Sequence, residues 1–362
     1  MSITGADSRN RSFDIIFSVR RPVPIPASGG LILSYRCTSR CRHCIYACGP
    51  EWSADWMSRT DLEQILSNLA GKILPAPGGP ENVGLNHGLH FTGGEPFANF
   101  ELLLSAVTLA SDLSIPSTFV ETNCFWAKDT RTAREMLSAL RERGLKGIMI
   151  SVNPFYLEAV PFERTERAID TALEIFGGNT MVYQAEYYRR FREWEFGDRV
   201  PFEKYLSFES RRDLFRNVEF FLMGRAPYRL RDLLGEFLPP RGAEDFFREP
   251  CSTPFLRSLH NHFDNYGNYV PGFCAGISLG DARNLDSLLE AGVDTEERPV
   301  LGFLMDGDMP GLFRFAQERG YNERPGGYFS RCHLCTDLRR HLAEYGDFPE
   351  LAPAEFYRHL EP

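Results

Sequence analysis

Three cysteines in a short polar segment are the clearest candidates for chemistry in this sequence. They are Cys37, Cys41 and Cys44, spaced C-x3-C-x2-C after the apolar run 31–33. Cysteine thiolates are the usual ligands of iron–sulfur clusters, and three of them on one loop can hold one face of a four-iron cube. Because three ligands leave one iron open, this spacing predicts a reactive metal centre and not a purely structural one.

The same segment also fits a structural zinc site. Cys48 lies four residues after Cys44, and four thiolates at short spacing suit a closed tetrahedral zinc ion. A second motif favours iron: Gly93-Gly94-Glu95 follows the predicted strand 88–91. Two glycines let the backbone approach a ligand closely, and the neighbouring carboxylate can receive an ammonium group. A zinc knuckle does not need such a motif, so we favour the iron–sulfur interpretation.

Together these two motifs resemble the signature of the radical S-adenosylmethionine (SAM) superfamily. The resemblance implies that Cys37, Cys41 and Cys44 bind a [4Fe–4S] cluster whose open iron takes the amine and carboxylate of SAM. It also implies that the superfamily's SAM-contacting positions fall at His43, Gly93, Gly94, Glu95, Thr122, Asn123, Ser151 and Asn153. The alternative for the strand-end residues among them is that they merely form turns, as Asn and Ser often do.

Two positions depart from the superfamily pattern. His43 stands before the third cysteine, where an aromatic residue is frequent, and Cys124 follows Asn123, where glycine is frequent. A thiol at the mouth of a barrel could donate a hydrogen atom to a substrate radical, which makes Cys124 the candidate catalytic residue. The alternative is that Cys124 is a small packed side chain.

The order of predicted elements indicates an α/β fold. Short apolar runs at 31–33, 88–91, 117–121, 147–152, 180–184 and 218–222 alternate with amphipathic stretches, of which the first begins with a capping box at Thr60. Six such units predict a partial (β/α)6 TIM-like barrel, whose functional groups lie at the carboxyl ends of its strands.

A second group of cysteines lies beyond a Pro- and Gly-containing stretch at 239–242. Cys251, Cys274, Cys332 and Cys335 form this group, and a predicted hairpin lies between the first two. The arrangement resembles the auxiliary-cluster extensions called SPASM and twitch, with twitch the better match for four cysteines. The resemblance implies a second [4Fe–4S] cluster with no open iron, although zinc would suit the same four residues. We therefore predict a lead-in (1–30), a partial barrel (31–238) and an α+β auxiliary-cluster domain (239–362).

Size and composition limit the classes of partner. The chain has 362 residues, 43% of them apolar and 25% charged, with a net charge of -9. The acidic balance argues against a nucleic-acid partner, and neither a secretory signal nor a membrane-spanning run is visible. Seven of the nine cysteines fall into the two groups, which indicates metal ligands in a reducing, cytoplasmic compartment, and Cys48 and Cys124 are left over.

The predicted function is reductive cleavage of SAM to a 5′-deoxyadenosyl radical that removes a hydrogen atom from a substrate. We favour an oxidation with the auxiliary cluster as electron acceptor, because the four-cysteine pattern resembles that of inosamine dehydrogenases, which act on small cyclitols. An external donor such as flavodoxin or ferredoxin would supply the first electron. The alternatives are maturation of a ribosomal peptide by crosslinking or epimerisation, and a non-enzymatic zinc-binding interaction protein.

Overall fold

A computed structural model describes residues 20–53, 56–249 and 251–361. Most of the predicted lead-in (1–30) therefore lies outside the described residues. The strands are β1 (Arg20–Arg21), β2 (Gly29–Ile32), β3 (Leu89–Thr92), β4 (Phe119–Thr122), β5 (Gly147–Ser151), β6 (Thr180–Tyr183), β7 (Asn261–Asp264), β8 (Tyr269–Val270) and β9 (Val293–Asp294).

A single large sheet organises the chain. Its strand order is β6-β5-β4-β3-β2-β7-β8, in which every neighbouring pair is parallel except the antiparallel pair β7–β8. β6 and β8 are the edges of this sheet, so within the described residues it is open. The predicted α/β class with a parallel central sheet is confirmed. Parallel strands direct all their carboxyl ends to one rim, where a site can be assembled from several loops.

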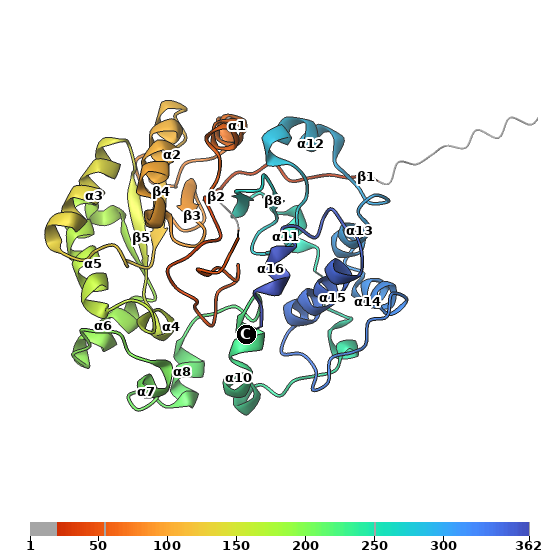
Figure 1. Cartoon of the computed structure of the whole chain (residues 1–362). Coiled ribbons are helices and arrows are strands. Elements are labelled where there is room, and N and C mark those ends of the chain that lie inside the picture. Colours follow the sequence, from red (N-terminus) through yellow and green to blue (C-terminus); the bar gives the residue numbers. More distant parts are fainter. Residues whose placement is uncertain (1–19, 54–55, 250, 362) are drawn as a thin grey trace, which may run out of the picture.

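Helices cover the sheet and fill the C-terminal part of the chain (Figure 1). Their bounds are α1 (Arg59–Leu69), α2 (Phe100–Asp112), α3 (Thr130–Glu142), α4 (Pro154–Leu157), α5 (Phe162–Phe176), α6 (Ala185–Glu193), α7 (Phe202–Tyr205), α8 (Arg211–Asn217), α9 (Ala226–Arg229), α10 (Arg231–Phe237), α11 (Thr253–Leu256), α12 (Leu285–Ala291), α13 (Pro299–Met305), α14 (Met309–Gln317), α15 (Arg331–Tyr345) and α16 (Glu355–Arg358). None of the described helices combines the length and apolar composition that a membrane crossing requires.

The first helix shows how local sequence sets an element and where our prediction was wrong. α1 buries the predicted apolar stripe of Leu62, Ile65, Leu66 and Leu69. Its N-cap, however, is Ser58 and not Thr60. The Ser58 hydroxyl oxygen accepts from the backbone N–H of Asp61 at 3.1 Å, and the Ser58 hydroxyl donates to the Asp61 carboxylate. Ser58 thus caps the helix two residues before the predicted position, and Asp61 stands at the third helical position.

The sixth predicted strand, 218–222, is not a strand in the structure. β6 ends where Gln184 adopts a left-handed conformation with φ 62°, which interrupts the ladder. The Gln184 side chain instead donates to the carbonyl of Glu219 and accepts from its N–H, both at 3.0 Å. One amide side chain therefore attaches this segment beside β6, and the sixth parallel position belongs to β7 on the opposite side of the sheet.

The predicted hairpin in the C-terminal region is present, and it extends the barrel sheet. His262 pairs with Val270 and Phe263 with Tyr269 across β7 and β8. The turn depends on Asp264, whose carboxylate accepts from the N–H groups of Tyr266 and Asn268. Because β7 also pairs with β2, residues on both sides of the predicted boundary at 239 share one sheet. The division into a barrel and an auxiliary domain stays a prediction.

Candidate functional site

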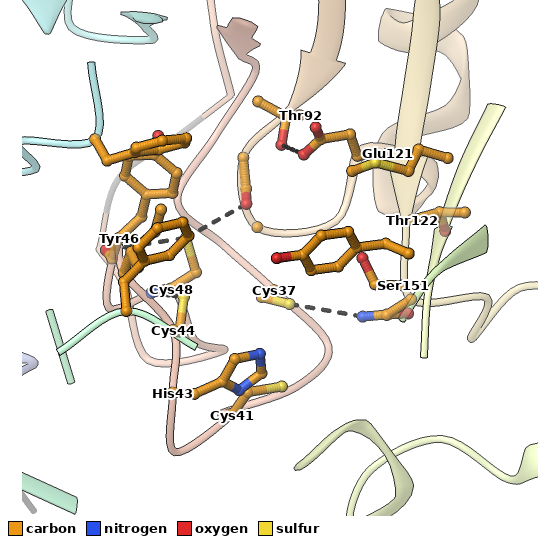
Figure 2. Close-up of a pocket in the computed structure, with 18 of the residues that line it drawn as sticks. Cys37, Cys41, His43, Cys44, Tyr46, Cys48, Thr92, Glu121, Thr122 and Ser151 are labelled. Atoms are coloured by element: carbon orange, nitrogen blue, oxygen red, sulfur yellow. Dashed lines mark hydrogen bonds between the residues drawn. The ribbon is translucent and has the colours of Figure 1, made fainter. Parts of the chain in front are cut away.

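A cavity of about 340 Å³ lies at the carboxyl ends of the parallel strands. One side is the cysteine loop that follows β2. Another is formed by the ends of β3, β4, β5 and β6, and a third by β7 and residues 219–221. Figure 2 shows the cysteine loop facing the strand ends that carry Thr92, Glu121 and Ser151. The volume lies within the range of small-molecule sites.

The three predicted cluster ligands face this cavity together. Cys37, Cys41 and Cys44 all line it, on a loop closed by hydrogen bonds from the Cys37 N–H to the Gly49 carbonyl and from the Gly49 N–H to the Tyr35 carbonyl. Backbone N–H groups point at two of the sulfurs: Ser39 N lies 3.4 Å from the Cys37 Sγ, and Cys48 N lies 3.4 Å from the Cys44 Sγ. Such donors stabilise thiolates.

Burial and hydrogen bonding shift the pKa values of these thiols in opposite directions. A hydrogen bond from the Cys48 side chain lowers the pKa of Cys44 to about 6. Burial raises the pKa of Cys37 and of Cys41 instead. Two thiols are therefore protonated at neutral pH unless a positive charge is bound beside them. This set of three converging sulfurs, one of them already acidic, fits a cluster that supplies that charge.

Cys48, the fourth thiolate of the zinc alternative, is buried next to the triad. Its thiol lies 3.5 Å from the Gly93 carbonyl oxygen, to which it can donate. The Cys48 side chain therefore connects the cysteine loop to the glycine motif. Cys48 would be the fourth ligand of a zinc site but would not be a ligand of a three-thiolate cluster, so its role distinguishes the two interpretations.

The glycine motif packs directly on the cysteine loop. The Gly94 N–H donates to the Ser34 carbonyl at 2.8 Å, and the Glu95 N–H donates to the Arg36 carbonyl at 3.2 Å. A Cβ at Gly94 would collide with the Arg36 carbonyl oxygen, so only glycine permits this approach. Gly93 and Gly94 line the cavity.

Glu95 is placed differently from the glycines. Its side chain is buried and does not line the cavity. One carboxylate oxygen accepts from the Phe97 N–H and the Thr122 hydroxyl, and the other accepts from the Asn123 N–H at 2.8 Å. The carboxylate thus joins the end of β3 to the end of β4, which is a positioning role and not the ligand contact that we expected.

We expect Glu95→Gln to remove a pH dependence of stability. Burial raises the pKa of Glu95 to about 7 from a usual value of 4.5. Because the pKa of Glu95 is higher in the folded state than in the unfolded state, its protonation adds about 3 kcal/mol to the free energy of unfolding. This contribution is fully present below pH 4.5 and is lost as the pH rises through 7. The amide stays neutral but leaves the Asn123 N–H unpaired. The variant should therefore be less stable than wild type at pH 5.5 and close to it at pH 8, measured as anaerobic melting temperature.

The control for this prediction is Glu101→Gln, in the exposed first turn of α2. It should shift the melting temperature equally at both pH values. A constant difference between Glu95→Gln and wild type across the range would contradict the assignment.

The remaining predicted SAM contacts fall into two groups. His43, Ser151 and Asn123 line the cavity, and so does Thr122. Asn153 does not; its amide donates to the His43 Nε2 at 3.1 Å, which positions the ring. Phe155 stacks on His43 with a centroid separation of 4.8 Å, and burial lowers the pKa of His43 to about 3. His43 is therefore a neutral, fixed aromatic surface at physiological pH.

Cys124 does not reach the cavity. Its side chain is fully buried and absent from the lining, and its N–H donates to the Thr122 hydroxyl oxygen at 3.0 Å. Our expectation of a thiol at the mouth of the barrel is not met, because the backbone at Cys124 adopts a left-handed φ of 68° behind the end of β4. A hydrogen-atom donor must touch the substrate, so this geometry favours a packing role.

Arg225 supports the site from behind, which the sequence did not reveal. Only 1% of its surface is exposed, and its guanidinium donates to the backbone carbonyls of Cys41 (3.0 Å), Cys48 (2.8 Å) and His359 (3.1 Å). The Gly224-Arg225 pair in the sequence was the available signal. Nothing in that pair shows which partner the arginine meets, whereas the structure shows a buried cation that fixes the cysteine loop.

We expect Arg225→Lys to lower the free energy of unfolding by about 3 kcal/mol and to speed iron loss. An ammonium group cannot reach three carbonyls arranged for a planar guanidinium, so two buried acceptors lose charge-assisted hydrogen bonds. Anaerobic melting and the rate of iron release to a chelator measure this. Arg229→Lys, at the half-buried end of α9, is the matched control and should change stability by less than about 0.5 kcal/mol. Equal effects of the two substitutions would contradict the role of Arg225.

The four C-terminal cysteines also converge. Cys251, Cys274, Cys332 and Cys335 line a small cavity of about 30 Å³ together with Arg339. Burial raises the pKa of Cys251 to about 12 and that of Cys274 further, so a bound cation is needed to hold them as thiolates. Arg339 is 4% exposed and contributes positive charge. Cys332 and Cys335 lie in the first turns of α15, where the helix dipole favours anions.

The two cysteine sites are neighbours in the structure. Ile45 and Phe273 line both the large cavity and the small one, so these two side chains stand between them. Ile45 directly follows Cys44, and Phe273 directly precedes Cys274. Such adjacency is suitable for electron exchange between groups bound at the two sites.

The fold and the site together define an α/β protein with one three-cysteine and one four-cysteine centre. No family model and no curated protein matches the chain. Among solved structures, BtrN in complex with AdoMet and 2-DOIA is 12% identical, with a TM-score of 0.43 over 81% of this chain and 91% of that one. Native anSMEcpe with bound AdoMet and Kp18Cys peptide is 15% identical, with a TM-score of 0.44 over 90% and 98%. Similarity at this level assigns neither a family nor an activity.

Proposed function

We propose that this chain is a radical SAM enzyme that oxidises a small polar substrate. The observation that carries the proposal is the convergence of the Cys37, Cys41 and Cys44 thiols with the Gly93-Gly94 backbone on one cavity. The two motifs, 49 residues apart from Cys44 to Gly93, thereby meet at the rim where parallel strands end, as they must if they serve one reaction.

The cysteine triad would hold a [4Fe–4S] cluster, and the neighbouring cavity would hold SAM. When bound, such a cluster supplies the electron that cleaves SAM into methionine and a 5′-deoxyadenosyl radical, which takes a hydrogen atom from the substrate. The triad leaves one iron without a protein ligand, which is where SAM would bind. The N–H groups of Ser39 and Cys48 and the cation of Arg225 balance the negative charge of three thiolates.

Residues around the triad would bind and orient SAM. The Gly93-Gly94 backbone, which lines the cavity, would lie against its amine, and the neutral ring of His43 is a flat surface for adenine. Ser151 offers a hydroxyl to the ribose or the carboxylate, whereas the Asn123 amide lines the cavity but already bonds to the cysteine loop at Thr38 and Ser39. Glu95 and Asn153 lie behind the cavity lining, and the Thr122 hydroxyl, although it reaches the lining, already bonds to Glu95.

The opposite part of the cavity suits a small polyhydroxylated molecule such as a sugar or cyclitol. Its lining combines the carboxylates of Glu121 and Glu219 with the phenol of Tyr183, which can bind hydroxyl groups. Phe221 and Phe273 add apolar walls that exclude water from a radical.

The C-terminal cysteines support the choice of an oxidation. A substrate that loses a hydrogen atom must lose a second electron and a proton to complete a dehydrogenation. A second [4Fe–4S] cluster at Cys251, Cys274, Cys332 and Cys335 would supply the acceptor for that electron, separated from the substrate by Ile45 and Phe273. A flavodoxin- or ferredoxin-type protein would supply the first electron.

The proposal is tested by metal analysis and product detection on anaerobically purified and reconstituted protein. We expect about eight irons and eight sulfides per chain and formation of 5′-deoxyadenosine from SAM under dithionite. A colourless protein that holds zinc in both cysteine sites and leaves SAM intact would overturn it.

A further inference from the structure

Three buried histidines meet at a side of the cavity that neither group of cysteines forms. His90 lies on β3, His262 on β7, and His260 directly precedes β7. One ring nitrogen from each lies within 4.8 Å of the others. The three side chains are exposed by only 2%, 2% and 6% respectively. Nothing in the proposed SAM chemistry uses them.

The sheet is built to bring two of these rings together. Gly30 of β2 pairs with His90 on one side and with His262 on the other, so both side chains stand on the same face of the sheet. A Cβ at Gly30 would collide with the His90 Nε2 and with the His262 ring. Glycine at this position thus leaves the space above β2 in which the imidazoles approach each other.

Hydrogen bonds to backbone carbonyls set the tautomers of two of the rings. The Nδ1 of His260 lies 3.1 Å from the Leu85 carbonyl, and the Nδ1 of His262 lies 2.8 Å from the Gly272 carbonyl. Carbonyls only accept, so each Nδ1 carries the proton and each Nε2 presents a lone pair. Backbone carbonyls commonly fix metal-binding histidines in this way.

The third ring has a nitrogen without a partner. The Nε2 of His90 is buried and makes no hydrogen bond. A carboxylate oxygen of Glu121 lies 3.5 Å from it, too far for a good hydrogen bond but close enough to contribute negative charge. Leaving such a nitrogen unpaired in the interior costs about 1–3 kcal/mol, which a bound cation would offset.

We propose that His90, His260 and His262 bind a divalent transition-metal ion, with zinc as the representative, and that the ion has an open coordination position toward the cavity. Neutral imidazole suits zinc, and three protein ligands leave the fourth position to water or substrate. His260 and His262 line the cavity, so the open position is accessible to a substrate oxygen. The ion would anchor a hydroxyl or carboxylate of the substrate.

Metal binding must displace one hydrogen bond. The Tyr46 hydroxyl lies 3.0 Å from the His262 Nε2 and 3.1 Å from its Nδ1. Because Nδ1 carries the proton, the hydroxyl can donate to Nε2 in the absence of a metal. Tyr46 belongs to the cysteine loop, two residues after Cys44. Tyr46→Phe removes this competitor, so zinc affinity should be unchanged or higher in that variant, whereas loss of zinc would contradict the geometry.

The test is zinc analysis of the full-length, cluster-loaded protein. We expect one zinc per chain after incubation with Zn²⁺ and removal of free metal, and a zinc K-edge absorption spectrum with nitrogen or oxygen neighbours at about 2.0–2.1 Å. Iron in the clusters does not contribute at this edge. Absence of retained zinc, or sulfur neighbours at about 2.3 Å, overturns the proposal.

Variants then assign the ligands. His90→Gln and His262→Gln should each weaken zinc binding at least about tenfold, whereas His341→Gln, on α15, should not. If a variant does not fold, the zinc K-edge spectrum of the wild-type protein still shows whether nitrogen or sulfur atoms bind the zinc. The outcome is separable from the proposed function: eight irons, SAM cleavage and no zinc would refute this site alone. Histidine-bound zinc without SAM cleavage would refute the radical chemistry alone.

Discussion

Replacing Cys41 by alanine is expected to lower 5′-deoxyadenosine formation from SAM at least about a thousandfold, equivalent to about 4 kcal/mol of barrier. Cys41 is the central member of the triad, and its thiol lines the cavity beside Cys37 and Cys44. Two remaining thiolates cannot hold three corners of a cube, so the cluster is lost together with the site at which SAM would bind. Iron counting should fall from about eight to about four per chain.

The informative control is Cys48→Ala, next to the triad. If three thiolates hold a cluster, the Cys48 thiol is a hydrogen-bond partner of Cys44 and of the Gly93 carbonyl but not an iron ligand, so its loss should keep eight irons and most of the SAM cleavage. If four thiolates hold zinc, Cys48→Ala should release the metal as readily as Cys41→Ala does. Identical behaviour of these two variants would contradict the radical SAM assignment.

Replacing Cys332 by alanine is expected to separate the two steps of the proposed oxidation. Cys332 lines the small cavity with Cys251, Cys274 and Cys335, and a cubane cluster needs all four thiolates when no other ligand is present. The iron content should fall from about eight to about four, while SAM cleavage under dithionite continues. Turnover of substrate to an oxidised product should stop, because the second electron has no acceptor.

Simultaneous measurement of iron, 5′-deoxyadenosine and product distinguishes this result from general damage. Cys124→Ala is the matched control, since Cys124 is a buried cysteine that lines neither cavity. It should keep all of its iron. If Cys332→Ala retained eight irons, the four-cysteine site would not hold a cluster; if it lost iron but still oxidised substrate, that cluster would not be the acceptor.

Local patterns in the sequence were sufficient for several features. The C-x3-C-x2-C spacing places three thiols on one short loop whatever surrounds them, because so few residues separate them. The glycine pair could be recognised because only glycine tolerates the close backbone approach that the Arg36 carbonyl makes at Gly94. The first five parallel strands and the helices between them were also predictable, since apolar periodicity reflects burial on one face.

Features that depend on contacts between distant segments could not be predicted in this way. Apolar residues 218–222 suggested a sixth strand, yet that segment is attached by the Gln184 side chain, and β7 takes a place beside β2. The role of Arg225 could not be predicted, because nothing near it in the sequence shows that it bonds to Cys41 and Cys48.

The same limit applies to the groups around the cavity. Glu95 was expected to face a ligand, but donors from β4 turn its carboxylate inward. His90 and His262 are 172 residues apart in the chain and meet only because both strands pair with Gly30. The sequence by itself determined which residues can bind metal, since ligand chemistry belongs to the side chain. The tertiary structure alone decided which of them share a cavity, because strand register sets the side chains that stand on one face.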